Sequence, residues 1–417
     1  MVTDEEFAAR MAALGPFEAA PRIAAGVSGG ADSMGLALLA HTWARSRGGS
    51  LQALVVDHGL RNESGKEASD TVACLGERGI AAKILVIQGL GPGAGLAERA
   101  RHARFAALEM ACAEAGILHL LLGHHAGDQA ETLQIRALGS SGPAGMAGMA
   151  PIVETTNLRL LRPLLTVPPE RLRKTLTFFR VQWFEDPSNA DAAALRPRLR
   201  RLRGDSDGSG SATTALVAAS MASGRLRAEQ DGRVAATLAE YVALRPEGFA
   251  MLAARPIAPP VLAALVQTIS GAPFPPATRA VSALAAAPRP ATLAGVRLVS
   301  AGRLGMGLLA VREPAAMASP IPAQPGAVWD GRFRLGAEAR VPSGATLGPL
   351  GDDAARFRRL SPLPSAVLRT LPAVRCGSVL LAVPHLFYPG HDGWACFPVQ
   401  FAPPRPAAAA PFWFGDA

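Results

Sequence analysis

Residues 26–40 read GVSGGADSMGLALLA, in which a glycine-rich loop, SGGADS, separates two patterned segments. The apolar run at residues 22–27 predicts a buried strand before the loop, and apolar side chains at helical spacing over 33–43 predict a helix after it. Backbone N–H groups and the dipole at a helix start both favour an anion. No lysine follows the glycines as in a Walker A loop, so the loop suits a pyrophosphate held mainly by backbone amides.

Strand and helix patterns alternate through the first half of the chain. Further strands are predicted at residues 51–56, 83–87 and 117–122, and a long helix at 96–115. Near-continuous apolar strands separated by helices predict an α/β fold whose parallel sheet is covered on both faces. Ligands bind beyond the carboxyl ends of the strands in such sheets, and polar clusters follow three of the predicted strands.

The composition changes near residue 204, where a Gly, Ser and Asp-rich link, GDSDGSGSATT, begins. We therefore expect three domains: an α/β domain at 1–204, a mainly helical domain at 205–318 and a small mixed domain with a Pro/Ala-rich tail at 319–417. Alanine-rich helices are predicted at 215–244 and 260–286, and a hairpin within 292–312.

Charge and cysteine content indicate the partner and the compartment. The net charge of +9 and a pI near 10.3 favour an anionic partner, with nucleic acid first and a membrane surface second. The four cysteines form no CxxC pair, which favours reduced thiols in a cytoplasmic protein. The first residues are acidic where a signal peptide is basic, and no apolar run approaches the roughly 18–20 residues that span a bilayer. No protein partner is evident.

The loop resembles the SGGxDS signature of the PP-loop ATP pyrophosphatases, which split ATP into AMP and pyrophosphate to adenylate a carbonyl oxygen. Further stretches are similar to motifs of the tRNA(Ile)-lysidine synthase family, in the same order: VDHGLR (56–61), ARHARF (100–105), GHHAGDQAET (123–132), RPLL (162–165) and WFEDPSNADAAALRPRLR (183–200). The stretches WDGRFRL (329–335) and LPSAVLRTLPAV (363–374) more weakly resemble the C-terminal substrate-binding domain of that family.

The resemblance implies an enzyme with a PP-loop (HUP-like) catalytic domain, a tRNA-binding or linker domain and a C-terminal substrate-binding domain. Such an enzyme uses ATP and Mg²⁺ to adenylate the C2 carbonyl oxygen of the wobble cytidine in tRNA(Ile) with a CAU anticodon. The amine of free L-lysine then displaces AMP and gives lysidine.

The resemblance and the residue types together assign candidate site residues. ATP-binding candidates are Ser28, Gly29, Gly30, Ala31, Asp32, Ser33, Asp57, His58 and His124. Catalytic candidates are Asp32, Asp128, Glu131, Arg101, Arg104 and Arg196, and the Mg²⁺ candidates are Asp32, Asp57 and Asp128. The candidates for tRNA binding are Arg198, Arg200, Arg201 and Arg203, and Arg200 is also a candidate for the developing phosphate charge.

Asp128 and Glu131 are three residues apart and share a helix face, so both suit the lysine amine and either could take its proton. Asp57 alone would read as a strand-end turn residue. His124 and His125 do not suit a shared metal because they are adjacent and lack an obvious third ligand, and the resemblance implies positions near the nucleotide for both. Trp183 and Phe184 are expected in the core, with base stacking as the alternative.

Two departures from the family pattern bear on activity. Gly127 stands where the family often has a second acidic residue, and Gly139 stands in place of an arginine. Two other readings remain open: an idle tRNA-binding protein with the same fold, and a related tRNA thiolation enzyme. The second is disfavoured because the cysteines form no motif.

Overall fold

The computed structural model describes residues 1–59, 63–91, 93–155, 157–185, 195–205, 208–390, 393–405 and 407–408. Parts of two motifs that carry the family resemblance lie outside the described residues, namely residues 60–61 of VDHGLR and residues 186–194, which include DPSN. The chain forms two compact units, unit 1 (Met1–Glu229) and unit 2 (Gln230–Ala409). The three-domain division with boundaries at 204 and 318 stays a prediction.

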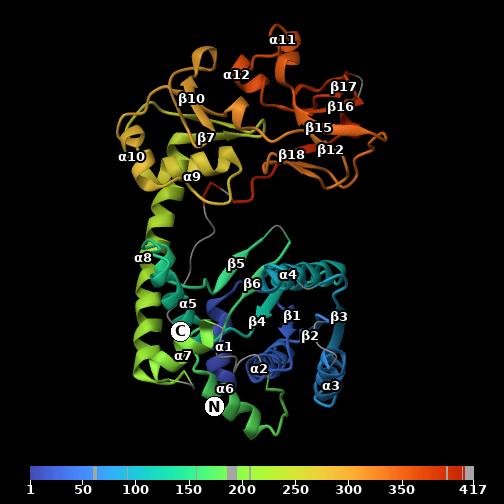
Figure 1. Cartoon of the computed structure of the whole chain (residues 1–417), viewed down its shortest axis with the longest axis vertical. Coiled ribbons are helices and arrows are strands. Elements are labelled where there is room, and N and C mark those ends of the chain that lie inside the picture. Colours follow the sequence, from blue (N-terminus) through green and yellow to red (C-terminus); the bar gives the residue numbers. More distant parts are fainter. Residues whose placement is uncertain are drawn as a thin grey trace. The chain divides into compact units, whose positions relative to one another are not determined.

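Unit 1 is built on a six-stranded sheet with the order β3-β2-β1-β4-β6-β5 (Figure 1). Neighbouring strands from β3 to β6 are parallel, and the edge strand β5 is antiparallel to β6. The predicted parallel sheet is confirmed, with the antiparallel edge as an addition. The strands are β1 (Arg22–Val27), β2 (Ser50–Asp57), β3 (Ala81–Val86), β4 (His119–Leu122), β5 (Ile152–Glu154) and β6 (Arg159–Leu161).

Helices cover both faces of this sheet because alternate strand residues point to opposite sides. In β1, Ile23 and Ala25 belong to the core formed with α1, α2 and α6, whereas Ala24 belongs to the core formed with α4. The helices of unit 1 are α1 (Asp4–Ala13), α2 (Ala31–Ser46), α3 (Ser64–Gly76), α4 (Leu96–Glu114), α5 (Ala126–Leu138), α6 (Pro169–Phe178) and α7 (Leu195–Arg203).

The register of the sheet brings the predicted motifs to one edge. Val27 pairs with Val55 of β2, and Gly26 pairs with Leu122 of β4, all in parallel. The segments after β1, β2 and β4 therefore leave the sheet at the same edge, as expected for ligand binding in this architecture.

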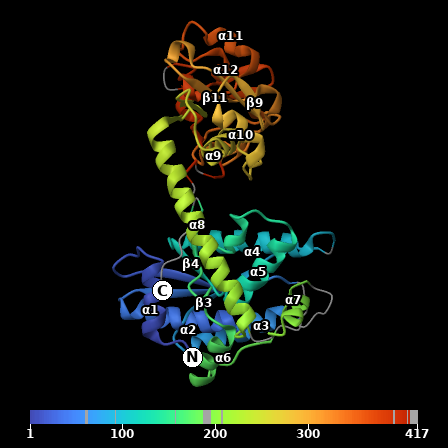
Figure 2. The same cartoon turned by 90° about the vertical axis from the view of Figure 1, so that its left-hand side faces the viewer.

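Helix α8 (Ser211–Tyr241) is continuous across the boundary between the units (Figure 2). Unit 2 contains a five-stranded sheet of order β7-β8-β11-β10-β9, and the antiparallel pair β10–β11 confirms the predicted hairpin. The predicted mainly helical domain at 205–318 therefore also contains these five strands. Each strand has only three to five residues, which is too short to show a clear alternation of apolar and polar side chains in the sequence. The elements are β7 (Val242–Arg245), β8 (Phe249–Leu252), α9 (Pro259–Ser270), α10 (Thr278–Ala286), β9 (Ala291–Leu293), β10 (Val296–Ser300) and β11 (Leu308–Arg312).

The rest of unit 2 is made of short elements around a buried ion cluster. Asp330 accepts hydrogen bonds from Arg312 and Arg332, and all three side chains are buried. The elements are β12 (Ile321–Pro322), β13 (Val328–Trp329), β14 (Phe333–Leu335), β15 (Ala345–Pro349), α11 (Ala354–Phe357), α12 (Ser365–Leu368), β16 (Pro372–Cys376), β17 (Val379–Ala382) and β18 (Val399–Phe401).

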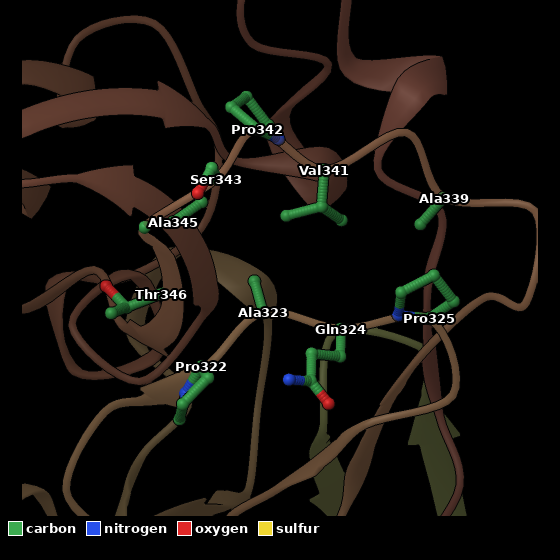
Figure 3. Close-up of a pocket in the computed structure, with 11 residues that line it drawn as sticks. Pro322, Ala323, Gln324, Pro325, Ala339, Val341, Pro342, Ser343, Ala345 and Thr346 are labelled. Carbon is green, nitrogen blue, oxygen red and sulfur yellow. The ribbon is translucent and has the colours of Figure 1, made fainter.

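A cavity of about 470 Å³ lies in unit 2, lined mainly by proline, alanine and valine side chains from residues 322–325 and 339–346 (Figure 3). It has no charged lining residue, so it does not suit a nucleotide. Among the described residues, no helix is both long and apolar enough to cross a membrane.

Candidate active site at the carboxyl edge of the unit 1 sheet

The loop between β1 and α2 requires glycine at position 29 and leads into α2 without a side-chain cap. Gly29 has a φ of +80°, and a Cβ atom there would lie 2.6 Å from Thr71 Oγ1. Ser33 Oγ accepts a hydrogen bond from the Ser28 amide and donates one to the Gly30 carbonyl, both at 3.0 Å. Gly30 is the N-cap of α2 and makes no side-chain cap. The loop therefore keeps the geometry that favours an anion at a helix start.

His125 caps the start of α5. Its Nδ1 accepts hydrogen bonds from the amides of Gly127 (3.0 Å) and Asp128 (3.4 Å). Asp128 Oδ2 accepts from the His125 amide at 3.0 Å, which completes a capping box. Because Nδ1 is an acceptor, the neutral ring carries its proton on Nε2.

The Nε2 atom of His125 lies between two predicted site carboxylates. It is 3.4 Å from Asp32 Oδ2, in the first turn of α2, and 3.6 Å from Asp128 Oδ2. Burial lowers the pKa of His125, but the carboxylates of Asp128 and Asp32 raise it by more. A second proton could enter only at Nδ1, where it would break both cap bonds. The structure thus brings Asp32 and Asp128 together through His125, for which the sequence patterns indicated no specific role.

Helix α7 lays a row of arginines along α5. Arg200 Nε donates to Glu131 Oε1 at 2.5 Å, and Arg203 Nη1 donates to Gln134 Oε1 at 2.9 Å. Arg196 is looser, 3.8 Å from Asp128 Oδ1 and 3.9 Å from Glu131 Oε2. Glu131 is fully buried, whereas the Asp128 side chain is 15% exposed. The predicted shared face of Asp128 and Glu131 is therefore the face that contacts α7.

The arginines predicted to bind tRNA divide into two sets. Arg198 and Arg201 are exposed on α7. Arg200 and Arg203 instead hydrogen-bond to side chains of α5. A helix places residues 198 and 201 on one face and residues 196, 200 and 203 on another, so Arg203 lies with Arg196 and Arg200 and not with Arg198 and Arg201, beside which it was expected.

A second group of cations lies near the ends of β1, β4 and β6. The Arg104 guanidinium reaches the end of β1, since a Cβ at Gly26 would lie 3.9 Å from its Nη2. Burial lowers the pKa of Arg104, and the charge of Arg101 lowers it further. Arg162 directly follows β6 and is buried; burial and Arg101 lower its pKa to about 10. Like charges therefore gather at this edge.

Two histidines beside these arginines are neutral at physiological pH. Burial lowers the pKa of His124 to about 4, and the charges of Arg162, Arg101 and Arg104 add to this against the opposing effect of Asp128. Burial and Arg104 likewise lower the pKa of His58. Neutral rings keep hydrogen-bonding capacity without adding positive charge.

Asp57 is occupied by its own loop. Its Oδ1 accepts hydrogen bonds from the Gly59 amide (2.9 Å) and from Ser64 Oγ (2.6 Å), and the latter bond is the largest cause of a lowered Asp57 pKa. These bonds are those of a strand-end turn, so a role of Asp57 toward nucleotide or Mg²⁺ stays a prediction.

The donor set fits Mg²⁺ bound with substrate phosphates better than a protein cage. Within the described ranges, no group of three His, Cys, Asp or Glu side chains is arranged to hold a metal ion. In the same ranges, Asp32 Oδ1 is a buried oxygen without a hydrogen-bond partner. Mg²⁺ commonly takes one or two carboxylates and completes its shell with water and phosphate, so Asp32 fits such a site.

The two departures from the family pattern have local structural consequences. A Cβ at Gly127 would lie 2.9 Å from His125 Cε1, so only a glycine at this position leaves room for the capping ring. After α5, Arg136 Nη1 donates to the carbonyls of Gly145 and Gly148, both at 2.6 Å. Arg136 therefore holds the glycine-rich segment that follows Gly139.

The sequence patterns gave no role to Arg162 and Gln134, and they placed His125 near the nucleotide without a specific role. A signal existed for His125, because it stands directly before a helix with an acidic residue three positions later, which is the spacing of a capping box. Arg162 lies in the quoted RPLL stretch, but only the fold shows that its guanidinium is buried near Arg101. Gln134 gave no signal. Phe184, expected in the core, is 39% exposed, and its amide donates to the Gly29 carbonyl.

Comparison with known proteins agrees with the predicted PP-loop fold. The PP-loop domain family matches residues 3–203. The tRNA(Ile)-lysidine synthase of Bradyrhizobium diazoefficiens is 42% identical over 187 residues, which is 44% of this chain and 52% of that protein. The chain thus spans about half the length of such curated relatives. A U34-tRNA thiolase structure from Methanococcus maripaludis aligns with 16% identity and a TM-score of 0.45, covering 52% of this chain and 76% of that one.

One relative extends the match into unit 2. The tRNA(Ile)-lysidine synthase of Mesorhizobium japonicum is 35% identical over 352 residues, which covers 80% of this chain and 76% of that protein. With identity at this level across three quarters of a curated member, the chain belongs to the tRNA(Ile)-lysidine synthase family.

Proposed function

We propose that the protein uses ATP and Mg²⁺ to join free lysine to C2 of the wobble cytidine in tRNA(Ile) with a CAU anticodon. The observation that carries the proposal is that two sites of opposite charge lie at the same edge of the sheet. An arginine-rich group suits the phosphates of ATP, and the carboxylates of α5 suit a substrate ammonium.

The nucleotide end is supported by the loop and the arginines. Amides of the loop at Gly29 and Gly30 would hold the pyrophosphate, and Arg104 and Arg162 would stabilise charge that develops on the transferred phosphorus. Mg²⁺, held through Asp32, would neutralise the phosphate oxygens and assist the leaving of pyrophosphate.

The proposed site for the lysine amine, at Asp128 and Glu131, is supported by the loose contacts that Arg196 makes there. Its guanidinium lies 3.8 Å and 3.9 Å from carboxylate oxygens of Asp128 and Glu131, beyond hydrogen-bond distance. Glu131 Oε2 has no hydrogen-bond partner among the described residues. A lysine ammonium would make the close bonds that Arg196 does not, and Arg196 would then turn to the phosphate.

The chemistry has two steps. The C2 carbonyl oxygen attacks the α-phosphorus of ATP, and the bond to the bridging oxygen of pyrophosphate breaks. The lysine amine then attacks C2, the bond from C2 to the AMP oxygen breaks, and the amine loses a proton. Asp128 is the better acceptor for that proton, because Glu131 is fully buried and already bound by Arg200.

The exposed arginines Arg198 and Arg201 would contact tRNA phosphates, which position the tRNA without reading its sequence. A tRNA substrate places the reaction in the cytoplasm. Among the other readings, thiolation gains no support from the cysteines: Cys74 is half-buried on α3 and bonded to the Gln182 carbonyl, Cys112 is buried, and Cys376 and Cys396 lie in unit 2.

The test is incorporation of radiolabelled lysine into tRNA(Ile) with a CAU anticodon, with the same tRNA carrying GAU as the control. We expect label only in the CAU tRNA, with AMP and pyrophosphate released. Asp32→Ala should abolish AMP release, and Asp128→Asn should abolish lysine incorporation. Salt-sensitive tRNA binding without turnover would instead indicate an idle binder, and incorporation of labelled sulfur would indicate a thiolation enzyme.

A further inference from the structure

We propose that His125 is a positioning residue that holds Asp32 and Asp128 at a fixed separation through its Nε2–H group. The inference rests on the proposed function, in which Asp32 serves the nucleotide end and Asp128 the amine end. His125 would set how far apart the two halves of the reaction lie.

The imidazole ring of His125 cannot turn freely. Nδ1 accepts two backbone hydrogen bonds at the start of α5, and Asp128 returns a bond to the His125 amide. The side chain is nine-tenths buried. A flipped ring would leave those amides without their cap, so Nε2 stays directed at the carboxylates.

The Nε2 atom of His125 faces two like charges from different helices. Asp32 Oδ2 at 3.4 Å belongs to α2, and Asp128 Oδ2 at 3.6 Å belongs to α5. Two carboxylates that approach one point repel each other unless a donor lies between them. An N–H group at similar distances from both supplies that donor.

The backbone before α5 also packs directly against the first turn of α2. A Cβ atom at Gly123 would lie 3.1 Å from the Asp32 carbonyl oxygen and 3.2 Å from Ser33 Cα. The segment between β4 and α5 therefore packs against the first turn of α2 without space for a side chain. His125 follows two residues later and reaches Asp32 from this contact.

The same geometry excludes a role as general base. Nε2 carries the proton of the neutral ring, and Nδ1 is engaged by the cap. His125 therefore acts as a donor to the carboxylates and not as an acceptor for the lysine proton.

Two substitutions separate the cap from the bridge. In His125→Asn the amide oxygen can still cap α5, but the side chain is too short to reach Asp32. In His125→Gln the longer side chain can reach Asp32 with its N–H group, but the cap is lost. We expect His125→Asn to keep the wild-type Tm, lower kcat by about 10–100-fold and raise the Mg²⁺ concentration for half-maximal rate. We expect His125→Gln to lower Tm and retain most of kcat.

A measurement on the ligand-free protein makes the proposal independent of turnover. Histidine ¹⁵N NMR at alkaline pH, where the ring is neutral, with His125 assigned from the signals missing in His125→Asn, should show a protonated Nε2 and an unprotonated Nδ1. A protonated Nδ1 in the neutral ring would overturn the proposal, as would wild-type kcat and Mg²⁺ dependence in His125→Asn. Failure of the proposed function would appear differently, as wild-type protein that incorporates no lysine while the ring state is as expected.

Discussion

Two groups of arginines in unit 1 have the same chemistry and opposite surroundings. On α7, Arg200 is bonded to the Glu131 carboxylate of α5, and Arg203 is bonded to Gln134. Near the strand ends, Arg101, Arg104 and Arg162 form no ion pair with a carboxylate within the described part of the chain. We name the first group the paired arginines and the second the unpaired arginines.

This difference separates arginines that stabilise the fold from arginines that are available to bind a ligand. A buried carboxylate such as Glu131 needs a cation, and Arg200 supplies it. Burial and the like charge of Arg101 lower the pKa of Arg104 and Arg162, so the unpaired arginines destabilise one another. An anion bound among them would remove that penalty, which is the behaviour expected of a phosphate site.

The largest expected effect tests the unpaired arginines. Arg162→Met should slow AMP release by about 10²–10³-fold, because a preorganised cation at a developing phosphate charge contributes on that scale. Its Tm should stay the same or rise, since the substitution removes a buried cation without a carboxylate partner. Rates of AMP release and thermal unfolding would be measured on the same preparation.

Arg162→Lys is the matched control for this comparison. Lysine keeps the charge but lacks the planar fork of the guanidinium, so it should recover only part of the rate. If Arg162→Met released AMP at the wild-type rate and lost stability, Arg162 would belong with the structural charges and the comparison would fail.

The next effect tests the paired arginines. Arg200→Met leaves the buried Glu131 carboxylate without its hydrogen bond, so we expect a loss of about 2–4 kcal/mol in the free energy of unfolding. Urea denaturation measures it. The double variant Arg200→Met with Glu131→Met should regain most of that loss, because no buried charge is left alone.

Arg198→Met serves as the control on the same helix. Arg198 is exposed, so its removal should change the free energy of unfolding by no more than about 0.5 kcal/mol. An equal loss in Arg198→Met and Arg200→Met would contradict the division of α7 into two faces.

Sequence patterns predicted the sheet of unit 1 well because its strands are short apolar runs with glycine-rich ends. The strand over residues 22–27 has the predicted bounds, and the helix over 96–115 is longer than observed by one residue. Strands β5 and β6 were not predicted, because three residues each give no measurable alternation. The five-stranded sheet of unit 2 was missed in part for the same reason.

The sequence placed many of the candidate residues at the carboxyl edge of the unit 1 sheet, but it did not predict their pairings. The spacing of Asp128 and Glu131 fixed their common face from sequence alone. Which arginine meets which carboxylate depends on how α7 lies against α5, a contact between segments about 70 residues apart. The same holds for His125, whose neighbour Asp32 comes from a different helix.

The smallest effect extends the comparison to the exposed face of α7. If Arg198 and Arg201 contact tRNA phosphates, replacing both by Met should reduce the slope of log binding constant against log salt by about 2. Arg203→Met is the matched control, because its guanidinium is bonded to Gln134 and its removal should leave the slope unchanged. Filter binding of tRNA(Ile) across a salt series gives all three slopes. An unchanged slope in the double variant would move the tRNA contact to residues 205–417, and an equal change in Arg203→Met would show that the bond to Gln134 opens when tRNA binds.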